Sequence, residues 1–174
     1  MKPWIYGRCS EWKWLTDVTE FHYYIGIEKH KVYLSAILDL YDRRIVAYRI
    51  SNSNNNLLVF DTFDDAVRDN PDAHPLFHSD RGFQYTNRTF HAKIEAAGMT
   101  QSMSRIAKCI DNGPMEGFWG ILKRERYYGR RFTAREALVA MIEDYICYYN
   151  NKRLQRSLGI LTPMEKYEIY LQAA

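Results

Sequence analysis

Three strand-like segments follow one another before any helical periodicity begins, and this order restricts the folds open to the chain. Residues 12–21 alternate imperfectly between apolar and polar side chains, and residues 32–41 are rich in apolar and β-favouring ones. Residues 45–50 form a third such segment after a polar turn. Each pattern predicts a strand. Because the connections are short and polar, we expect the three strands to form an antiparallel meander.

Helices and further strands alternate along the next part of the chain. Apolar residues recur at helical spacing from Leu57 onward, and Asn70-Pro71 stops that helix. The other expected elements are a strand at 75–79, a helix near 87–97 and a brief strand around 99–103. The pattern predicts an α/β fold, in which three antiparallel strands precede strands alternating with helices, and helices flank the mixed sheet. Reactive groups in such sheets lie at strand ends and in the following loops.

The C-terminal third of the chain carries three helix signals. Asp111 or Asn112 can cap a helix over 111–127, and capping boxes begin at Thr133 and at Thr162. No internal repeat interrupts the pattern, so we expect a single domain. It spans 1–174, with a core at about 12–150 and a helical extension at about 151–174.

Composition narrows the classes of function. The net charge is +3, from 24 basic and 21 acidic residues, which is weak evidence for a polyanionic partner. Three distant cysteines and five histidines without zinc-site spacing predict neither a disulfide framework nor a zinc knuckle. No run of about 18 apolar residues and no secretory signal occurs, so we expect a cytoplasmic protein without a membrane partner.

Basic and aromatic side chains are interleaved near the end of the helix expected over 111–127. Tyr127 and Tyr128 lie among the basic residues. Such an arrangement can hold phosphates while the rings stack on bases or sugars, although a solvated helix face has the same composition. The candidate DNA-contacting residues are Lys123, Arg124, Arg126, Arg130 and Arg131.

Three carboxylates stand where a metal site could form. Asp17 lies in the middle of a predicted strand, where an ionised side chain is costly to bury unless it is paired or binds a metal. Asp80 follows the strand at 75–79, directly before a turn signal. Glu116 shares one stripe of the 111–127 helix with Gly120 and Lys123, at about 100° per residue. On the helix alone, a pair of surface charges is the better explanation of that stripe.

The segments around these acids resemble the integrase-core transposases of bacterial insertion sequences, which are relatives of retroviral integrases with an RNase H-like fold. The matched segments are Thr16-Asp17-Val18-Thr19, His78-Ser79-Asp80 with Gly82, Gln84 and Tyr85, Ser102 to Arg105, Asp111-Asn112 with Glu116 and Lys123, and Tyr149-Asn150 with Arg153 and Thr162-Pro163. The likeness runs from about Trp12 to about Tyr167, and 35 residues separate Asp80 from Glu116. Several motifs in this order are highly specific together.

The resemblance implies that Asp17, Asp80 and Glu116 are a catalytic triad, and that Lys123 supports DNA contact. It implies metal-dependent cleavage at the 3′ ends of an element, followed by transfer of the freed 3′-hydroxyl to target DNA. Two Mg²⁺ or Mn²⁺ ions are expected with DNA bound, because carboxylates are the oxygen ligands that hard cations prefer. No other cofactor is implied. The protein is then expected to associate with the nucleoid.

In this interpretation, other residues of the motifs support the structure of the site and take no part in the chemistry. Asp39 is expected to form a turn or support the site, His78 to serve a structural role at its strand end, and Asn112 to cap a helix or anchor a loop. The family often has glycine where this chain has Ala107, which concerns the loop before Glu116.

The resemblance also implies partners. Family members usually carry a further N-terminal region with a helix-turn-helix, which we expect to be absent here and which a separate reading frame can supply. Joining two element ends needs at least two active sites, so we expect a homo-oligomer. Two alternatives stay open: an RNase H-like nuclease that only hydrolyses, and a truncated, inactive DNA-binding or assembly module.

Overall fold

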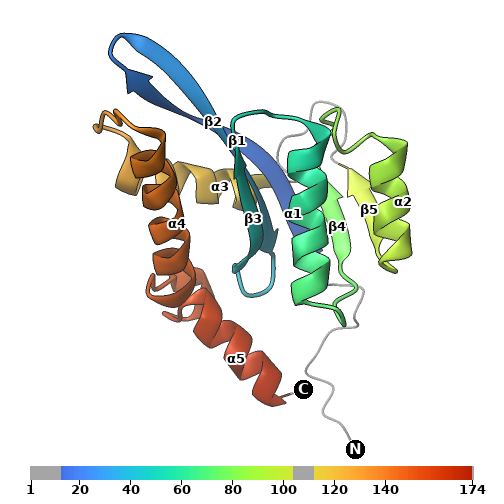
Figure 1. Ribbon diagram of the computed structural model, residues 1–174. Helices are drawn as coiled ribbons and strands as arrows, with labels where there is room; N and C mark the ends of the chain where they lie inside the picture. The colour runs from blue at the N-terminus through green and yellow to red at the C-terminus, as the bar shows by residue number, and fades with distance from the viewer. Residues whose placement is uncertain (1–12, 104–111, 174) are drawn as a thin grey trace, which may run out of the picture.

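The computed structural model describes residues 13–103 and 112–173 of the chain. Its strands form one mixed sheet in the order β3-β2-β1-β4-β5 (Figure 1). The pairs β1–β2 and β2–β3 are antiparallel, so the expected meander is confirmed, and β4 and β5 join β1 in parallel. The strands are β1 (Lys13–Ile25), β2 (Glu28–Asp39), β3 (Ile45–Ser51), β4 (Leu76–Ser79) and β5 (Thr100–Met103).

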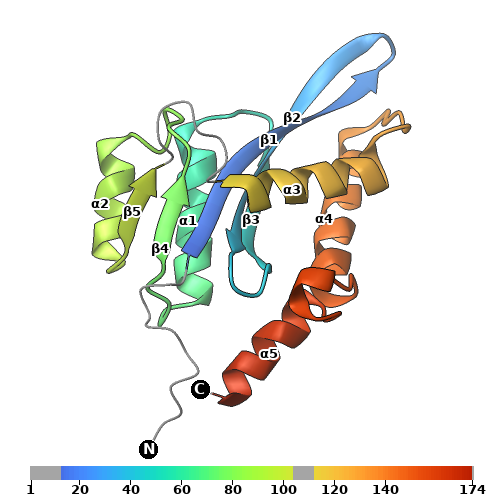
Figure 2. The same cartoon turned by 180° about the vertical axis from the view of Figure 1, so that it is seen from behind.

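Helices cover both faces of this sheet, as Figure 1 and Figure 2 show. On one face, α1 (Asn56–Asp69) and α2 (Arg88–Ala96) pack over an apolar cluster that includes Phe63, Phe77 and Phe90. On the other face, α3 (Gly113–Leu122) and α4 (Arg135–Asn151) pack over a second cluster. The two clusters make this a layered α/β domain, as the periodicities predict.

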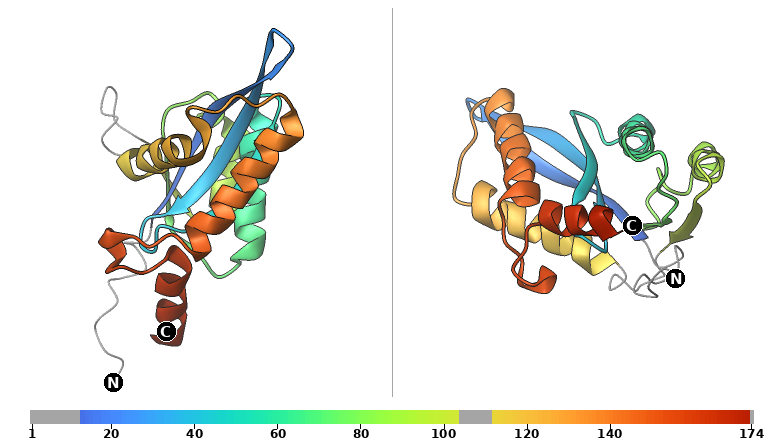
Figure 3. Two further views of the ribbon diagram at one scale, coloured as in Figure 1. Left: turned by 90° about the vertical axis from the view of Figure 1, so that its left-hand side faces the viewer. Right: turned by 90° about the horizontal axis from the view of Figure 1, so that it is seen from below.

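The remaining elements continue from these helices. A π-helical turn (Lys123–Tyr127) extends α3, and a 3-10 turn (Arg156–Leu158) precedes α5 (Pro163–Ala173). Figure 3 shows α5 beyond the end of α4. Across the described residues, no helix combines the length and apolar character needed to cross a membrane.

The hairpin of β1 and β2 projects as an arm beyond the rest of the sheet (Figure 3). Both strands are longer than predicted, since β1 continues to Ile25 and β2 begins at Glu28. Residues distant in sequence accept hydrogen bonds from the backbone at the outer edge of the arm. His22 N–H donates to the Tyr127 hydroxyl at 3.0 Å, and Tyr24 N–H donates to the Phe132 carbonyl at 2.9 Å. These contacts extend the strand past the end of its apolar alternation.

One of the two predicted capping boxes forms. Thr162 Oγ1 accepts from Glu165 N–H at 3.1 Å, and the Glu165 carboxylate accepts from Thr162 N–H at 2.7 Å. The prediction of a capping box at Thr133 is wrong, because α4 begins at Arg135 and its cap residue, Ala134, makes no side-chain hydrogen bond. Pairing of Phe132 with the arm accompanies an extended backbone up to Ala134. Asp111, Arg105 and Ala107 lie outside the described residues.

The Asn150 side chain joins α4 to the start of β3. Its Oδ1 accepts from Ile45 N–H at 2.9 Å, and its Nδ2 donates to the Ile45 carbonyl at 3.0 Å. These two hydrogen bonds resemble the pairing of a neighbouring strand. They satisfy the N–H and carbonyl groups of Ile45 at the edge of the sheet, which would otherwise lack partners. It gives a physical reason for the Tyr149-Asn150 motif noted in the sequence.

We expect Asn150→Ala to lower the free energy of unfolding by about 2 kcal/mol, because both Ile45 backbone groups lose their partner. Urea denaturation measures the change. Asn151→Ala is the matched control, since exposed Asn151 donates only within its own helix, to Cys147, and should change stability by less than about 0.5 kcal/mol. Equal effects of the two substitutions would contradict the role given to Asn150.

Candidate active site

Asp17 and Asp80 come from adjacent parallel strands. Leu15 of β1 is in register with His78 of β4, so the residues two positions further on, Asp17 and Asp80, follow that pair on the two chains. Asp17 is half-buried within β1, whereas Asp80 is exposed directly after the last residue of β4. The sheet therefore brings together two of the three predicted carboxylates.

Helix α3 brings the third carboxylate to the side of β1 that carries Asp17. The indole Nε1 of Trp119 donates to Asp17 Oδ2 at 3.0 Å, which fixes this part of α3 against β1. Glu116 lies one helical turn before Trp119 and is exposed. The negative charges of Asp80 and Glu116 both raise the pKa of Asp17, so all three groups lie within electrostatic reach.

The surroundings of Asp17 favour a positive partner. Burial is the largest cause that raises its pKa, to about 6, and the Val18 N–H and the Trp119 indole act in the opposite direction. Ionised Asp17 is therefore less stable here than in water, and its charge opposes folding as the pH rises through that value. A cation at this position would offset both the free-energy cost of burying the Asp17 charge and its repulsion by Asp80 and Glu116.

The donor chemistry fits a divalent ion, although the side chains are not gathered around one point. Among the described residues, no three His, Cys, Asp or Glu side chains lie close enough together to hold a single metal ion. The three carboxylates supply oxygen ligands only, which matches the preference of Mg²⁺ and Mn²⁺. Two of them are exposed, so their side chains have room to reorient.

The loop after β4 fixes the position of Asp80. Gly82 N–H donates to Asp80 Oδ1 at 2.8 Å. Tyr85 is buried, and its hydroxyl lies 3.3 Å from Thr16 Oγ1, one residue before Asp17. Gln84 is also buried and donates from Nε2 to Asn54 Oδ1 at 2.5 Å. These contacts place Gln84 and Tyr85 in the framework of the loop.

The three predicted supporting residues have separate surroundings. His78 is buried at the end of β4, with Nδ1 3.1 Å from Ser102 Oγ of β5. Asn112 stands at the cap position of α3 but makes no side-chain capping bond; instead its Nδ2 donates to the Thr16 carbonyl at 3.4 Å. Asp39 lies on β2 in register with Trp14, whereas Asp17 is in register with Ala36.

Asp39 therefore lies three register positions away from the partner of Asp17, next to the turn that follows β2. Its Oδ1 accepts from Tyr41 N–H at 2.7 Å, and its Oδ2 accepts from the Trp14 indole at 3.0 Å. These bonds make it a turn-forming residue. Of the two parts expected for Asp39, the geometry supports the turn and gives no contact with Asp17.

Lys123 lies against β1 in line with Asp17. Its Nζ donates to Thr19 Oγ1 at 2.7 Å and stands 5.1 Å from the centre of the Phe21 ring. Burial lowers the pKa of Lys123, while the charges of Glu20 and Asp17 raise it. The ammonium thus sits at the edge of the candidate site as a partly buried positive charge.

The four predicted arginines are exposed but do not share one environment. Arg131 stacks 4.3 Å over the Tyr24 ring and donates to the Gly26 carbonyl at the tip of the arm. Arg126 lies 5.9 Å over the Tyr148 ring of α4. Among the described residues, neither the guanidinium of Arg124 nor that of Arg130 makes a hydrogen bond or ion pair. Two of the four guanidinium groups are thus engaged with the fold itself.

Two functional contacts escaped the sequence interpretation. Trp119 fits the apolar face of its helix, so nothing in the pattern indicates that its indole holds Asp17. Glu125 bonds both Arg153, at 2.7 Å, and the hydroxyl of Tyr145, at 2.8 Å. That network explains the arginine of the Tyr149-Asn150-x-x-Arg153 motif, because it ties the π-helical turn to the end of α4.

Comparison with known proteins adds an independent line of evidence. Residues 7–109 match the family model described as integrase core domain, and residues 116–169 match a second model with the same description. The chain is 38% identical over 154 residues to the putative transposase InsK for insertion sequence element IS150 of Escherichia coli. It is 41% identical over 152 residues to an uncharacterized transposase-like protein of Haemophilus influenzae.

These alignments cover more of this chain than of its relatives. The alignments cover 88% and 87% of this chain, but 53% of the E. coli protein and 68% of the H. influenzae protein. The chain thus spans roughly half to two thirds of the length of these relatives. Activities of whole relatives therefore do not pass to it directly.

Solved structures resemble the fold at low sequence identity. The magnesium complex of the HTLV-2 integrase catalytic core domain, in its dimeric form, matches with a TM-score of 0.64 at 16% identity, covering 89% of this chain and 94% of that one. A chain of the simian T-cell lymphotropic virus intasome matches with a TM-score of 0.71 at 15% identity, covering 89% and 53%. The expected RNase H-like α/β fold is confirmed.

Proposed function

The chain belongs to the integrase-core family of insertion-sequence transposases, and on that premise we propose that it joins DNA strands with Asp17, Asp80 and Glu116 as its catalytic carboxylates. The observation that carries the proposal is that Asp80, after β4, and Glu116, on α3, both lie within electrostatic reach of Asp17 on β1. The pKa of Asp17 is raised by both of the others. Three like charges held together suit a reaction that depends on divalent cations.

The proposed reaction transfers a phosphodiester bond. A 3′-hydroxyl attacks a phosphorus atom of target DNA, a new P–O bond forms, the existing P–O bond to the 3′ oxygen breaks, and the attacking hydroxyl gives up its proton. In the first step, water takes the place of the 3′-hydroxyl. No covalent protein–DNA bond is required, so none of the 14 tyrosines needs to act as a nucleophile.

Divalent ions, two when DNA is bound, would be held by the three carboxylates and would stabilise the charge on the attacking and leaving oxygens. The chain's own residues set up that site. Trp119 holds one oxygen of Asp17, Gly82 holds one oxygen of Asp80, and Lys123 adds a fixed positive charge beside β1. Glu116, which is exposed, is free to turn toward the other two.

The proposed partners follow from the same chemistry. We expect DNA to lie across the carboxylates and along the side that carries Lys123 and the arginines at 124, 126, 130 and 131. A joining reaction on two element ends needs two active sites, so the working form is expected to be a homo-oligomer. A helix-turn-helix segment from a separate reading frame would provide recognition of the element ends.

A branched DNA that resembles a strand-transfer product tests the proposal. The reverse of strand transfer depends least on recognition of the element ends. With Mg²⁺ or Mn²⁺, the folded chain is expected to reseal the branch and release a shorter strand. Cleavage without resealing would favour a nuclease that only hydrolyses. No product from folded protein with metal present would favour an inactive binding or assembly module.

We expect Trp119→Phe to slow resealing about tenfold or more while leaving the fold intact. The substitution keeps an aromatic ring but removes the 3.0 Å bond to Asp17, and a hydrogen bond to a charged group contributes about 1.5–3 kcal/mol. Rates per folded molecule give the measurement. Trp14→Phe is the matched control, because Trp14 loses an equal bond, 3.0 Å to Asp39, on the other face of the sheet from Trp119. Similar rate losses in both variants would contradict a specific role for Trp119.

A further inference from the structure

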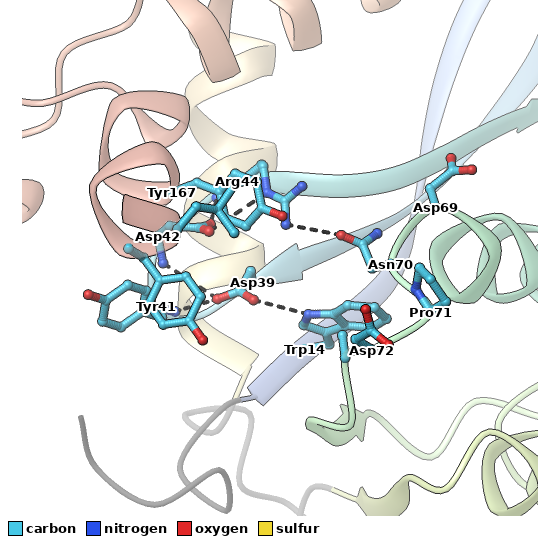
Figure 4. A pocket seen from close by; sticks show the side chains of 13 residues that line it. Trp14, Asp39, Tyr41, Asp42, Arg44, Asp69, Asn70, Pro71, Asp72 and Tyr167 are labelled. Atoms are coloured by element: carbon cyan, nitrogen blue, oxygen red, sulfur yellow. Dashed lines mark hydrogen bonds and ion pairs between the residues drawn. The ribbon is translucent and has the colours of Figure 1, made fainter. Parts of the chain in front are cut away.

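A pocket of about 300 Å³ lies beside the β1–β2 pair, where that pair begins at Trp14 and Asp39. Figure 4 shows it between the turn that joins β2 to β3, the end of α1 and helix α5. Trp14 and Asp39, which line it, are in register with each other at the end of the β1–β2 pair. Trp14 lies three residues before Asp17 on β1, so their side chains point to opposite faces of the sheet, and nothing in the proposed reaction uses the pocket.

The floor of the pocket holds two buried carboxylates, of Asp39 and Asp42. Asp39 is satisfied, since both of its oxygens accept N–H bonds from Trp14 or Tyr41. Asp42 is only 2% exposed, and its Oδ1 accepts from Arg44 N–H at 2.8 Å. Its Oδ2 forms an ion pair with Arg44, whose Nε lies 3.7 Å away, beyond hydrogen-bond distance.

The charge around the pocket is negative. Four aspartates and one arginine line it, and Asp69 and Asp72 stand exposed at the rim. Helix α1 ends at Asp69, so the negative end of its dipole adds to the same field. Outside the lining, Arg68 pairs with Asp69 and Lys166 lies 5.1 Å over the Tyr41 ring. In the described part of the chain, no side-chain cation hydrogen-bonds to Asp42 or Asp72, and the ion pair of Asp42 with Arg44 is a long one at 3.7 Å.

Aromatic rings form much of the wall. Trp14, Tyr41, Tyr167 and Tyr170 all line the pocket. The guanidinium of Arg44 already stacks 3.9 Å over the Tyr167 ring, and it reaches Asn70 Oδ1 at 3.4 Å. This wall therefore accepts a flat cation face-on. Aromatic faces beside a buried acceptor select for an organic cation that can both stack and donate.

We propose that this pocket binds a guanidinium group, which donates to Asp42 Oδ2 and stacks against the tyrosine wall. The negative lining excludes phosphate and DNA. A metal ion does not fit, because the described residues hold no group of three metal-ligating side chains and both Asp39 oxygens are occupied. Guanidinium suits a site of this kind better than ammonium, since it is planar and more weakly hydrated. Its source is either an arginine side chain of a polypeptide or a small guanidino compound.

Titration calorimetry with ethylguanidinium tests the proposal on the whole chain, without DNA or divalent metal, so the outcome is independent of the proposed catalytic function. We expect saturable binding of one molecule per chain, weaker binding of ethylammonium, and none of ethylurea, the neutral analogue of the same shape. Binding of ethylurea as tightly as ethylguanidinium would overturn the proposal, as would the absence of binding.

Asp42→Asn is expected to weaken ethylguanidinium at least tenfold, because it removes the charge and keeps the shape of the acceptor. If that variant fails to fold, Tyr170→Leu serves instead, since it shortens the aromatic wall from the exposed helix α5. Asp144→Asn, on the exposed side of α4, is the control and should bind like the wild type. Unchanged binding in the folded pocket variant would overturn the assignment. A short arginine-containing peptide that binds more tightly than ethylguanidinium identifies a polypeptide source, and equal binding identifies a free compound.

Discussion

Glu116→Gln is expected to lower the rate of resealing by about 10³-fold. Losing one charged metal ligand removes about 4 kcal/mol of stabilisation from the reaction. The loss should be purely chemical, because Glu116 is exposed and no hydrogen bond or ion pair ties it to another described residue. Its unfolding free energy should therefore match that of the wild type. Single-turnover resealing of branched DNA, with urea denaturation alongside, measures both quantities.

Glu168→Gln provides the matched control for that experiment. It makes the same chemical change at an exposed position of α5, a helix that carries none of the three proposed catalytic carboxylates. Its rate should equal that of the wild type. A folded Glu116→Gln variant that kept more than about a tenth of the wild-type rate would remove Glu116 from the catalytic set.

Gly82→Ala is expected to slow resealing about 10²-fold through its effect on Asp80. An added Cβ would stand 3.0 Å from Asp80 Oδ1, 3.1 Å from Gln84 Oε1 and 3.3 Å from Tyr85 Cδ2. Gln84 and Tyr85 are buried and held, so the exposed Asp80 carboxylate is the group that must move. A shift of about 1 Å in a catalytic group can reduce a rate by about 10²-fold. The same resealing assay measures this effect.

Gly117→Ala is the control for the added methyl group. Gly117 is exposed on α3 beside Glu116, and a Cβ there would meet nothing within 4 Å. Alanine in a helix should raise stability by up to about 1 kcal/mol and leave the rate unchanged. If Gly82→Ala resealed as fast as Gly117→Ala, the positioning of Asp80 by this loop would be contradicted.

Much of the fold could be predicted because its elements follow from local patterns. The order of strands and helices comes from periodicity and stop signals, and short polar turns require the antiparallel meander. The arm could not be predicted, since Tyr127 and Phe132, about 100 residues further along the chain, stabilise its edge. The same pairing explains why the capping signal at Thr133 is overridden. Local propensity decides an element only where no distant contact competes.

The candidate site also has features that could be predicted from the sequence and features that could not. The three acids could be singled out because each stands in a motif, and the fold brings them within electrostatic reach. The indole bond of Trp119 could not be predicted, because an aromatic residue on an apolar helix face gives no sign of a polar contact. The pocket around Asp42 could not be predicted either, since its walls come from three parts of the chain that only the fold assembles.

Resealing of branched DNA by the wild type and by Asp80→Asn, both shown to be folded, tests the central claim most directly. Asp80 is exposed, so asparagine should leave the fold unchanged while removing one of the charges that acts on Asp17. The account predicts resealing by the wild type with Mg²⁺ or Mn²⁺, none when the metal is chelated, and none by Asp80→Asn in either ion. Resealing by Asp80→Asn at the wild-type rate, or resealing by the wild type without metal, would contradict it.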